Sequence, residues 1–227
     1  MTEGTLPLGD FPLELGGTLP GAHVRYHTRG NLAAQPVVWV FHALTANSRP
    51  DQWWPGLFGP QGYYTDFAVV CVNVLGSPYG SSSPLTHGPQ GFPALTVRDV
   101  AAAQVAVAAH LGIGRIHTAI GGSFGGYQAL EFARAFRGNV DHLVLLATAA
   151  EEKPWNKAIH EAQRMALELD PTFGTPGGGK RGLAAARAVG MINYRTPEQY
   201  NRSQAETSEG VAAVPRAASY VRYQGQK

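Results

Sequence analysis

The chain has 227 residues, of which 44% are hydrophobic, and it carries 18 basic against 16 acidic side chains for a formal net charge of +2. A chain of this length can bury a full core, as one domain or as one domain with an insertion. The balanced charge, without a long run of either sign, gives no indication of a nucleic-acid or anionic-membrane partner. No apolar run approaches the roughly 20 residues of a membrane span and the N-terminus has no export pattern, so we expect a soluble cytoplasmic protein.

The single cysteine, Cys71, rules out an internal disulfide and fits a reducing compartment. It lies in the apolar run 67–75, which favours a buried strand residue over a nucleophile. We expect no metal site and no permanently bound cofactor.

The first half of the chain alternates apolar runs with turn signals. Residues 1–35 predict a β-hairpin or meander. The continuous apolar runs 36–41 and 67–75 are typical of strands buried on both faces of a parallel sheet. Between them, residues 46–66 predict a long loop with a short helix, and residues 76–84 predict a loop.

A regular alternation of helix and strand follows. Thr96 and Asp99 form a capping-box-like start for a helix that runs through Leu111. Next come a strand ending at Ile120, a helix after Ser123, and residues 141–147, which predict one more buried strand. Strand, helix and strand in repetition predict a mostly parallel α/β sheet with right-handed crossovers.

The character of the sequence changes near residue 150. Residues 155–169 and 183–192 predict helices, residues 174–182 predict a flexible link, and no apolar strand run reappears. We therefore predict two parts, an α/β core over residues 1–149 and a helical insertion over residues 150–227.

Residues 121–125, Gly-Gly-Ser-Phe-Gly, fit the pattern G-x-S-x-G between a strand and a helix. So sharp a turn strains its central residue and lifts the hydroxyl of Ser123 clear of the backbone, and it needs small neighbours. Ser123 is therefore a candidate nucleophile. A glycine-rich turn without chemistry is the alternative, because the chain has 28 glycines.

A serine that attacks a carbonyl needs donors for the resulting oxyanion. In this architecture the donors are the backbone N–H after the nucleophile, here Phe124, and one from the loop after an earlier strand, here Leu44. The alternative for Leu44 is a buried leucine at the end of a strand.

A set of motifs in fixed order makes the pattern more specific. They are His42-Ala-Leu-Thr45, Cys71-Val-Asn-Val-Leu-Gly76 with Tyr79-Gly-Ser-Ser82, Phe92-Pro-Ala-Leu-Thr-Val-Arg-Asp99, Gly121-Gly-Ser-Phe-Gly-Gly-Tyr-Gln-Ala-Leu130, Pro154-Trp-Asn156 with Gln163-Arg164 and Asp170-Pro171, and Gly182-Leu-Ala-Ala-Ala-Arg187 with Tyr194-Arg195. Together they resemble the homoserine O-acetyltransferases of methionine biosynthesis, which have the α/β-hydrolase fold. The resemblance spans nearly the whole chain; Phe124 stands where the family has Met or Leu.

The resemblance implies a double displacement. Ser123 would attack the thioester of acetyl-CoA, coenzyme A would leave, and the hydroxyl of L-homoserine would take the acetyl group. The resemblance also implies that Arg187 grips the carboxylate of the amino acid in a two-pronged ion pair. From the residues alone, a helix-surface arginine is the favoured interpretation of Arg187, and Lys180, Arg181 and Arg195 compete for the role. A homodimer through the helical insertion is implied as well.

The base that should activate Ser123 is not evident. In this fold the acid and the histidine follow the nucleophile along the chain, and only His142 and His160 do so. We expect His142 at the opposite edge of the sheet, His160 outside the family's base position, and His42 as a support for the oxyanion loop. We expect Asp141 at the same edge of the sheet as His142, opposite to Ser123. Asp170 precedes Pro171, and we expect it to be a turn residue at the end of a helix.

Compared with the family, the sequence stops within the insertion, short of the last strands with their acid and base. Taken literally, it predicts severely impaired acyl transfer. It also predicts an uncovered apolar edge at strand 143–147, with poor solubility or pairing to another chain. Other functions stay open: a homoserine succinyltransferase, a serine O-acetyltransferase or an esterase of the same fold, or an inactive fragment that acts as a binding partner.

Overall fold

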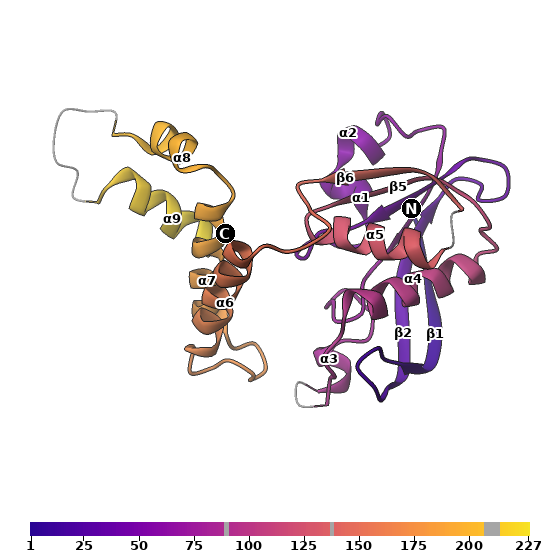
Figure 1. The fold of residues 1–227 in the computed structure, drawn as a ribbon, viewed down its shortest axis with the longest axis horizontal. Coiled ribbons are helices and arrows are strands. Elements are labelled where there is room, and N and C mark those ends of the chain that lie inside the picture. Colours follow the sequence, from indigo (N-terminus) through magenta and orange to yellow (C-terminus); the bar gives the residue numbers. More distant parts are fainter. Residues whose placement is uncertain (89–90, 137–138, 207–213) are drawn as a thin grey trace. The chain divides into compact units, whose positions relative to one another are not determined.

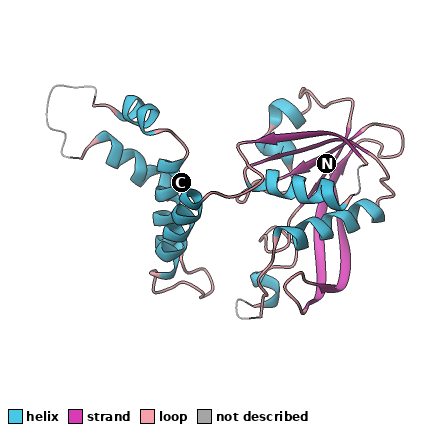
Figure 2. Cartoon of the chain, viewed as in Figure 1, coloured by secondary structure: helices cyan, strands magenta, loops and turns pink. Residues whose placement is uncertain are grey.

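The structure, a computed structural model, describes residues 1–88, 91–136, 139–206 and 214–227. Contacts between residues divide it into two compact units, Met1–Ala150 and Glu151–Lys227. The first is a sheet with helices and the second consists of helices (Figures 1 and 2). Residues 207–213 of the predicted insertion lie outside the described residues.

The described strands of the first unit form one six-stranded sheet in the order β1-β2-β4-β3-β5-β6. Their bounds are β1 (Thr2–Pro12), β2 (Thr18–Arg29), β3 (Val37–Phe41), β4 (Ala68–Val72), β5 (Ile116–Gly122) and β6 (Val140–Leu146). The pairs β1/β2 and β2/β4 are antiparallel, whereas β4/β3, β3/β5 and β5/β6 are parallel. The predicted mostly parallel α/β sheet with an N-terminal hairpin is therefore confirmed.

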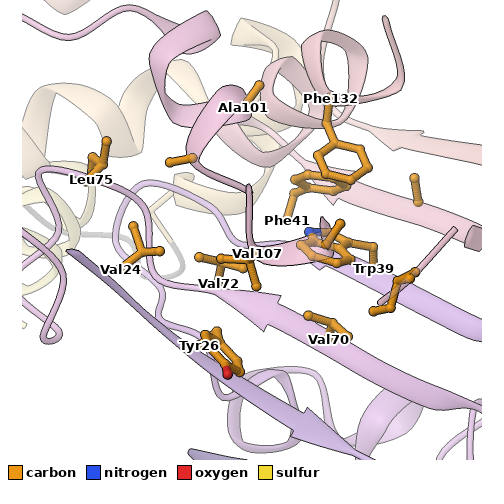
Figure 3. Close-up of a cluster of buried hydrophobic side chains, with 14 of the residues drawn as sticks. Val24, Tyr26, Trp39, Phe41, Val70, Val72, Leu75, Ala101, Val107 and Phe132 are labelled. Atoms are coloured by element: carbon orange, nitrogen blue, oxygen red, sulfur yellow. The ribbon is translucent and has the colours of Figure 1, made fainter. Parts of the chain in front are cut away.

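Alternate residues of the central strands face two separate apolar clusters, because successive side chains of a strand point to opposite faces. One face carries Trp39 and Phe41, packed with Val107 of α4 (Val97–His110) and Phe132 of α5 (Phe124–Ala135), as Figure 3 shows. The other carries residues packed with the short helices α1 (Pro50–Trp53) and α2 (Pro55–Phe58): Val38, Val40, Val69, Cys71 and Phe58. Every residue of β3 and β4 is buried, as the continuous apolar runs predict.

Three details of the first unit bear on predictions made from the sequence. The predicted capping box of α4 is confirmed, since the Thr96 hydroxyl accepts from the Asp99 N–H and the Asp99 carboxylate accepts from the Thr96 N–H. The short helix α3 (Pro84–His87) follows the predicted loop. Cys71 is free and fully buried, and burial raises the pKa of its thiol. It is a strand residue, as predicted.

The prediction that residues 141–147 form a buried strand is wrong in its burial. β6 is the last strand of the described sheet and pairs with β5 alone, so its side chains are exposed or half-buried. Leu143 and Leu146 are each 40% exposed. This matches the predicted uncovered apolar edge.

The second unit contains α6 (Pro154–Glu168), α7 (Lys180–Asn193), α8 (Pro197–Gln204) and α9 (Arg216–Gln226). The prediction that residues 174–182 form a link is wrong for its last three residues, which already belong to α7. The reason is Asp170, whose carboxylate accepts from the Gly182 N–H at 2.9 Å and holds the first turn of α7. Among the described residues, no helix is both long and apolar enough to cross a membrane.

Candidate active site

Ser123 lies between the end of β5 at Gly122 and the start of α5 at Phe124, on the sheet edge where the parallel strands end. Its φ is 54°, which is rare for a residue with a side chain. Two hydrogen bonds hold this strained conformation: the Ser123 N–H donates to Leu146 O at 2.9 Å, and the Gly126 N–H donates to Ser123 O at 2.9 Å. The residue is exposed. The strained, exposed serine expected from the sequence is therefore present.

The glycines around Ser123 are required by close packing with three different segments. A Cβ on Gly121 would collide with Gly125 O within the turn itself. On Gly125 it would collide with the carbonyl oxygen of Phe41, the last residue of β3. On Gly126 it would collide with the side chain of Thr148, just beyond β6. The serine turn is thus wedged between the ends of β3 and β6.

The loop after β3 begins with His42, which is fully buried. Its Nδ1–H donates to Ala43 O at 2.8 Å, and its Nε2 accepts from the Val74 N–H at 3.2 Å. The Ala43 carbonyl can only accept and the Val74 amide can only donate, so the ring is neutral with the proton on Nδ1. Burial lowers the pKa of His42. Both ring nitrogens hold the loop, in agreement with the supporting role expected for His42.

Leu44 lies in the turn that this loop makes, and its side chain is 75% exposed. The alternative of a buried leucine at the end of a strand is therefore wrong. Because Gly125 touches the carbonyl of Phe41, the loop begins directly beside the serine turn. Phe124 is the first residue of α5, and the first N–H groups of a helix have no acceptor within it. The geometry thus leaves the Phe124 N–H available to a ligand.

A buried polar network, which sequence reasoning missed, anchors the far end of the same loop. The Ser48 N–H donates to Asn73 Oδ1 at 2.6 Å, and Ser48 Oγ lies 2.6 Å from His27 Nδ1. Asn73 also donates to Tyr79 O at 2.6 Å. Burial is the main cause that lowers the pKa of His27. Ser48 is fully buried, so this serine has no access to a substrate.

Of the two histidines after Ser123, His142 belongs to the first unit and lies away from the serine turn, as predicted. His142 lies near the start of β6 and pairs with Thr118, whereas Leu146 pairs with Gly122 beside the serine. The step of four positions from His142 to Leu146 corresponds to about 13 Å along a strand. Asp141 pairs with Arg115, which lowers the pKa of its carboxyl.

His160 belongs to the second unit, where its ring pairs with the carboxylate of Glu152. Asp170 accepts from Gly182 and from Thr172, and these hydrogen bonds lower the pKa of its carboxyl to about 2. Asp170 therefore organises the turn before α7, as expected. Within the ranges that the structure describes, no cluster of three metal-ligating side chains occurs.

Arg187 lies in the middle of α7 and is half-buried. Its Nε is buried and has no hydrogen-bond partner among the described residues. Its competitors differ: Lys180 and Arg181 are exposed at the start of α7, and Arg195 lies over the ring of Tyr220, 5.1 Å from its centroid. Arg187 is thus the cation of α7 whose guanidinium is partly buried without a partner.

Known proteins similar to this chain fall into a consistent group. The sequence profile described as alpha/beta hydrolase fold matches residues 36–175. A homoserine O-acetyltransferase of Cyclobacterium marinum is 40% identical over 95% of this chain, and one of Chlorobaculum parvum is 38% identical over 96%. The chain spans 65% of the length of each of these relatives.

Solved structures agree on the fold. The crystal structure of a homoserine O-acetyltransferase from Staphylococcus aureus matches 99% of this chain with a TM-score of 0.80 and 34% identity, and 65% of that protein is covered. Esterase E22 matches 99% of this chain with a TM-score of 0.82 at 21% identity, and 72% of it is covered. At that identity the second likeness concerns the fold alone.

Proposed function

Because the chain belongs to the alpha/beta hydrolase fold family, we propose that it carries the nucleophile of an acyltransferase that moves the acetyl group of acetyl-CoA to the hydroxyl of L-homoserine. The observation that carries this proposal is Ser123, an exposed serine with a φ of 54° at a strand-to-helix turn packed on the end of β3. The acyl donor and acceptor come from the relatives named homoserine O-acetyltransferase.

In the first half of the reaction, Ser123 Oγ attacks the thioester carbon of acetyl-CoA. The carbonyl oxygen becomes an oxyanion and accepts hydrogen bonds from the N–H groups of Leu44 and Phe124. The intermediate collapses, the C–S bond breaks, and coenzyme A leaves as a thiol once it has taken a proton. In the second half, the homoserine hydroxyl attacks the carbonyl carbon of the acetyl-serine ester, the bond from that carbon to Ser123 Oγ breaks, and O-acetylhomoserine leaves. The proton lost by the homoserine hydroxyl restores the hydroxyl of Ser123. We assign the general base to no residue of this chain, and weak activity of the chain remains a prediction.

Arg187 is our candidate for the homoserine carboxylate. A guanidinium binds a carboxylate through two parallel hydrogen bonds, and an unpartnered, buried Nε on α7 suits such a ligand. We propose helices α6 to α9 as the lid that supplies this residue, and a homodimer in the cytoplasm as the working form. The reaction would serve methionine biosynthesis.

The transferase proposal is tested by mixing the protein with acetyl-CoA and following thiol release with and without L-homoserine. We expect release to rise with homoserine, and mass spectrometry to find one acetyl group on the Ser123 peptide, absent in Ser123→Ala. Release that ignores homoserine would point to an esterase. Release that responds to succinyl-CoA, or to serine as acceptor, would point to the other transferases of this fold.

The role of Arg187 is tested separately by Arg187→Lys, with Arg181→Lys as the matched control on the same helix. A lysine keeps the charge and loses the two-pronged geometry. We expect KM for homoserine to rise by about 10-fold to 100-fold, the equivalent of one charge-assisted hydrogen bond, while acetylation of Ser123 by acetyl-CoA stays unchanged. Equal effects of the two variants would contradict the assignment.

A further inference from the structure

We propose that Gln128 is a positioning residue whose buried side-chain amide ties the loop after β3 to the serine turn. The inference rests on the proposed function in one respect: the two segments that it joins carry the proposed oxyanion donors, Leu44 and Phe124. The contacts of His42 and Ser48 hold the loop to the rest of the sheet, and Gln128 adds a direct hydrogen-bonded link between the two segments that carry the donors.

The side-chain amide of Gln128 donates hydrogen bonds to both segments. The residue is fully buried in the second turn of α5. Its Nε2 donates to His42 O at 3.0 Å and to Phe124 O at 3.3 Å. A side-chain amide has two N–H groups, so both are used. One acceptor is in the peptide directly before the Ala43–Leu44 peptide, and the other belongs to the residue that follows Ser123.

The amide of Gln128 is held in this orientation by a one-way relay of hydrogen bonds. The indole N–H of Trp39, which can only donate, gives its hydrogen bond to Gln104 Oε1 at 2.9 Å. Gln104 Nε2 then donates to Gln128 Oε1 at 2.9 Å. The relay ends on two carbonyls, which can only accept. Turning either amide over would set donor against donor or acceptor against acceptor.

The apolar surroundings of the relay support a role in holding the loop after β3. Gln104 and Gln128 lie among fully buried apolar residues, including Phe41 and Phe132, where two apolar side chains of similar size would fill the same space. A buried polar network is tolerated only when every group is satisfied. Each side-chain nitrogen and oxygen of this network has a partner, and its last member, Gln128, donates to the backbone at the edge of the sheet where Ser123 lies. The relay thus links the core to the site.

The test compares three variants that remove the same kind of group. Gln128→Met keeps the length of the side chain and removes both donors. Gln104→Met leaves Gln128 in place without its support. Gln163→Met is the matched control, because Gln163 Nε2 also donates to a helix carbonyl, Ala186 O at 2.9 Å, but within the second unit. Each folded variant is examined by hydrogen exchange and by the rate of Ser123 acetylation.

Two protected amides report on the loop: Ala46 N–H, bonded to Ala43 O at 3.0 Å, and Val74 N–H, bonded to His42 Nε2. We expect Gln128→Met to speed exchange at both by about 10-fold or more and to slow acetylation by about 10-fold to 100-fold at saturating acetyl-CoA. The KM for acetyl-CoA should stay unchanged, because the tie acts on the oxyanion. Gln104→Met should move both readouts less, and Gln163→Met neither.

The outcomes separate this inference from the proposed function. Unchanged exchange at Ala46 and Val74 in folded Gln128→Met overturns the positioning role, whatever the activity. If the unaltered protein does not acetylate Ser123 even at the slow rate expected without an assigned base, the proposed function fails, while faster exchange in the variant still supports the tie. Should Gln128→Met not fold, Gln104→Met decides, and an effect no larger than that of Gln163→Met overturns the proposal.

Discussion

The two units of this chain hold themselves together in different ways. In the first, large side chains such as Trp39, Phe41 and Phe132 are fully buried between a sheet and its helices. In the described part of the second, Ala186 is the one buried hydrophobic residue, and the exposed large ones include Trp155, Leu183 and Tyr194. The sheet therefore has a core that can fix a catalytic geometry, whereas the helices offer apolar surface.

The helices of the second unit make up for the missing core by close backbone contact. Gly182 of α7 lies against the backbone of α6, where a Cβ would be 2.7 Å from Ala166 O. Gly225 of α9 lies against α7, where a Cβ would be 2.6 Å from Ala184 O. Small residues let helix backbones approach, but they bury little apolar area. We therefore expect the second unit to be the less stable of the two.

Deleting a large side chain should give the largest difference between the two units in the loss of stability. Phe132→Ala removes a ring that stacks on Trp39 with 5.1 Å between centroids, and such deletions cost about 3–5 kcal/mol. Trp155→Ala removes a ring that is 70% exposed and should cost less than about 0.5 kcal/mol. Urea unfolding followed by circular dichroism measures both. Similar losses would mean that the second unit has a core of its own.

Filling a glycine should give a smaller contrast. Gly125→Ala drives a methyl group into the carbonyl of Phe41 in the centre of the sheet, and overpacking of this kind costs about 1–3 kcal/mol. Acetylation of Ser123 should be lost with it. Gly225→Ala meets a helix carbonyl in the second unit, where α9 can shift. Thermal unfolding compares the two, and a larger loss for Gly225→Ala would contradict the expected rigidity of the sheet.

Acid should act on the two units at different pH. Burial lowers the pKa of His42 and His27 below the ordinary 6.5, so the unfolded chain binds more protons than the folded one just below that pH. Stability of the first unit is therefore lost as pH falls from about 6.5, by up to about 1.4 kcal/mol per pH unit for His42.

Asp170 responds at lower pH, because hydrogen bonds to its charged form lower the pKa of its carboxyl from 3.8 to about 2. Its stabilisation of the second unit is therefore lost only as pH falls from about 3.8 to about 2. Urea unfolding between pH 8 and 5 measures the effect of the two histidines on the first unit. Proteolysis of residues 171–182 at pH values between about 4 and 2 measures the effect of Asp170 on the second unit. A flat profile above pH 5 would contradict the buried neutral histidines.

The smallest contrast compares two threonine caps. Thr96 starts α4 and shares a capping box with Asp99, a buried residue that also accepts from the Glu14 N–H at 2.7 Å. Thr196 starts α8 at an exposed site. Thr96→Ala should cost about 1 kcal/mol, the typical value for the loss of such a cap, and Thr196→Ala about 0.5 kcal/mol, the low end of the range. Thermal unfolding of both variants checks the order.

Much of the first unit could be predicted from local sequence. The continuous apolar runs identified β3 and β4, and the G-x-S-x-G pattern identified the serine turn, because strand burial and turn sterics depend on neighbouring residues. Local sequence predicted a buried β6, and only the comparison with the family predicted its exposure, since exposure depends on which strands lie beside it. Its apolar sequence is the same whether it is central or at an edge.

The buried hydrogen-bond networks beside the site could not be predicted from the sequence for a related reason. His27, Ser48 and Asn73 come from three segments, and the glutamines of the relay come from two helices. No spacing rule joins residues that are distant in the chain. In the second unit, α8 and α9 were missed because their sequences are largely polar, and the start of α7 was missed because Asp170 holds it from 12 residues away.

The four tryptophans should make the difference in burial between the two units visible in intrinsic fluorescence. Trp39 is fully buried with its indole N–H bonded to Gln104, and Trp53 and Trp54 are half-buried in the same unit. Trp155 is the tryptophan of the second unit and is mostly exposed. Fluorescence of Trp39 should therefore appear at short wavelength and that of Trp155 at long wavelength. Intrinsic emission can follow each unit without an added dye, and the Trp39 signal responds directly to changes at Gln104.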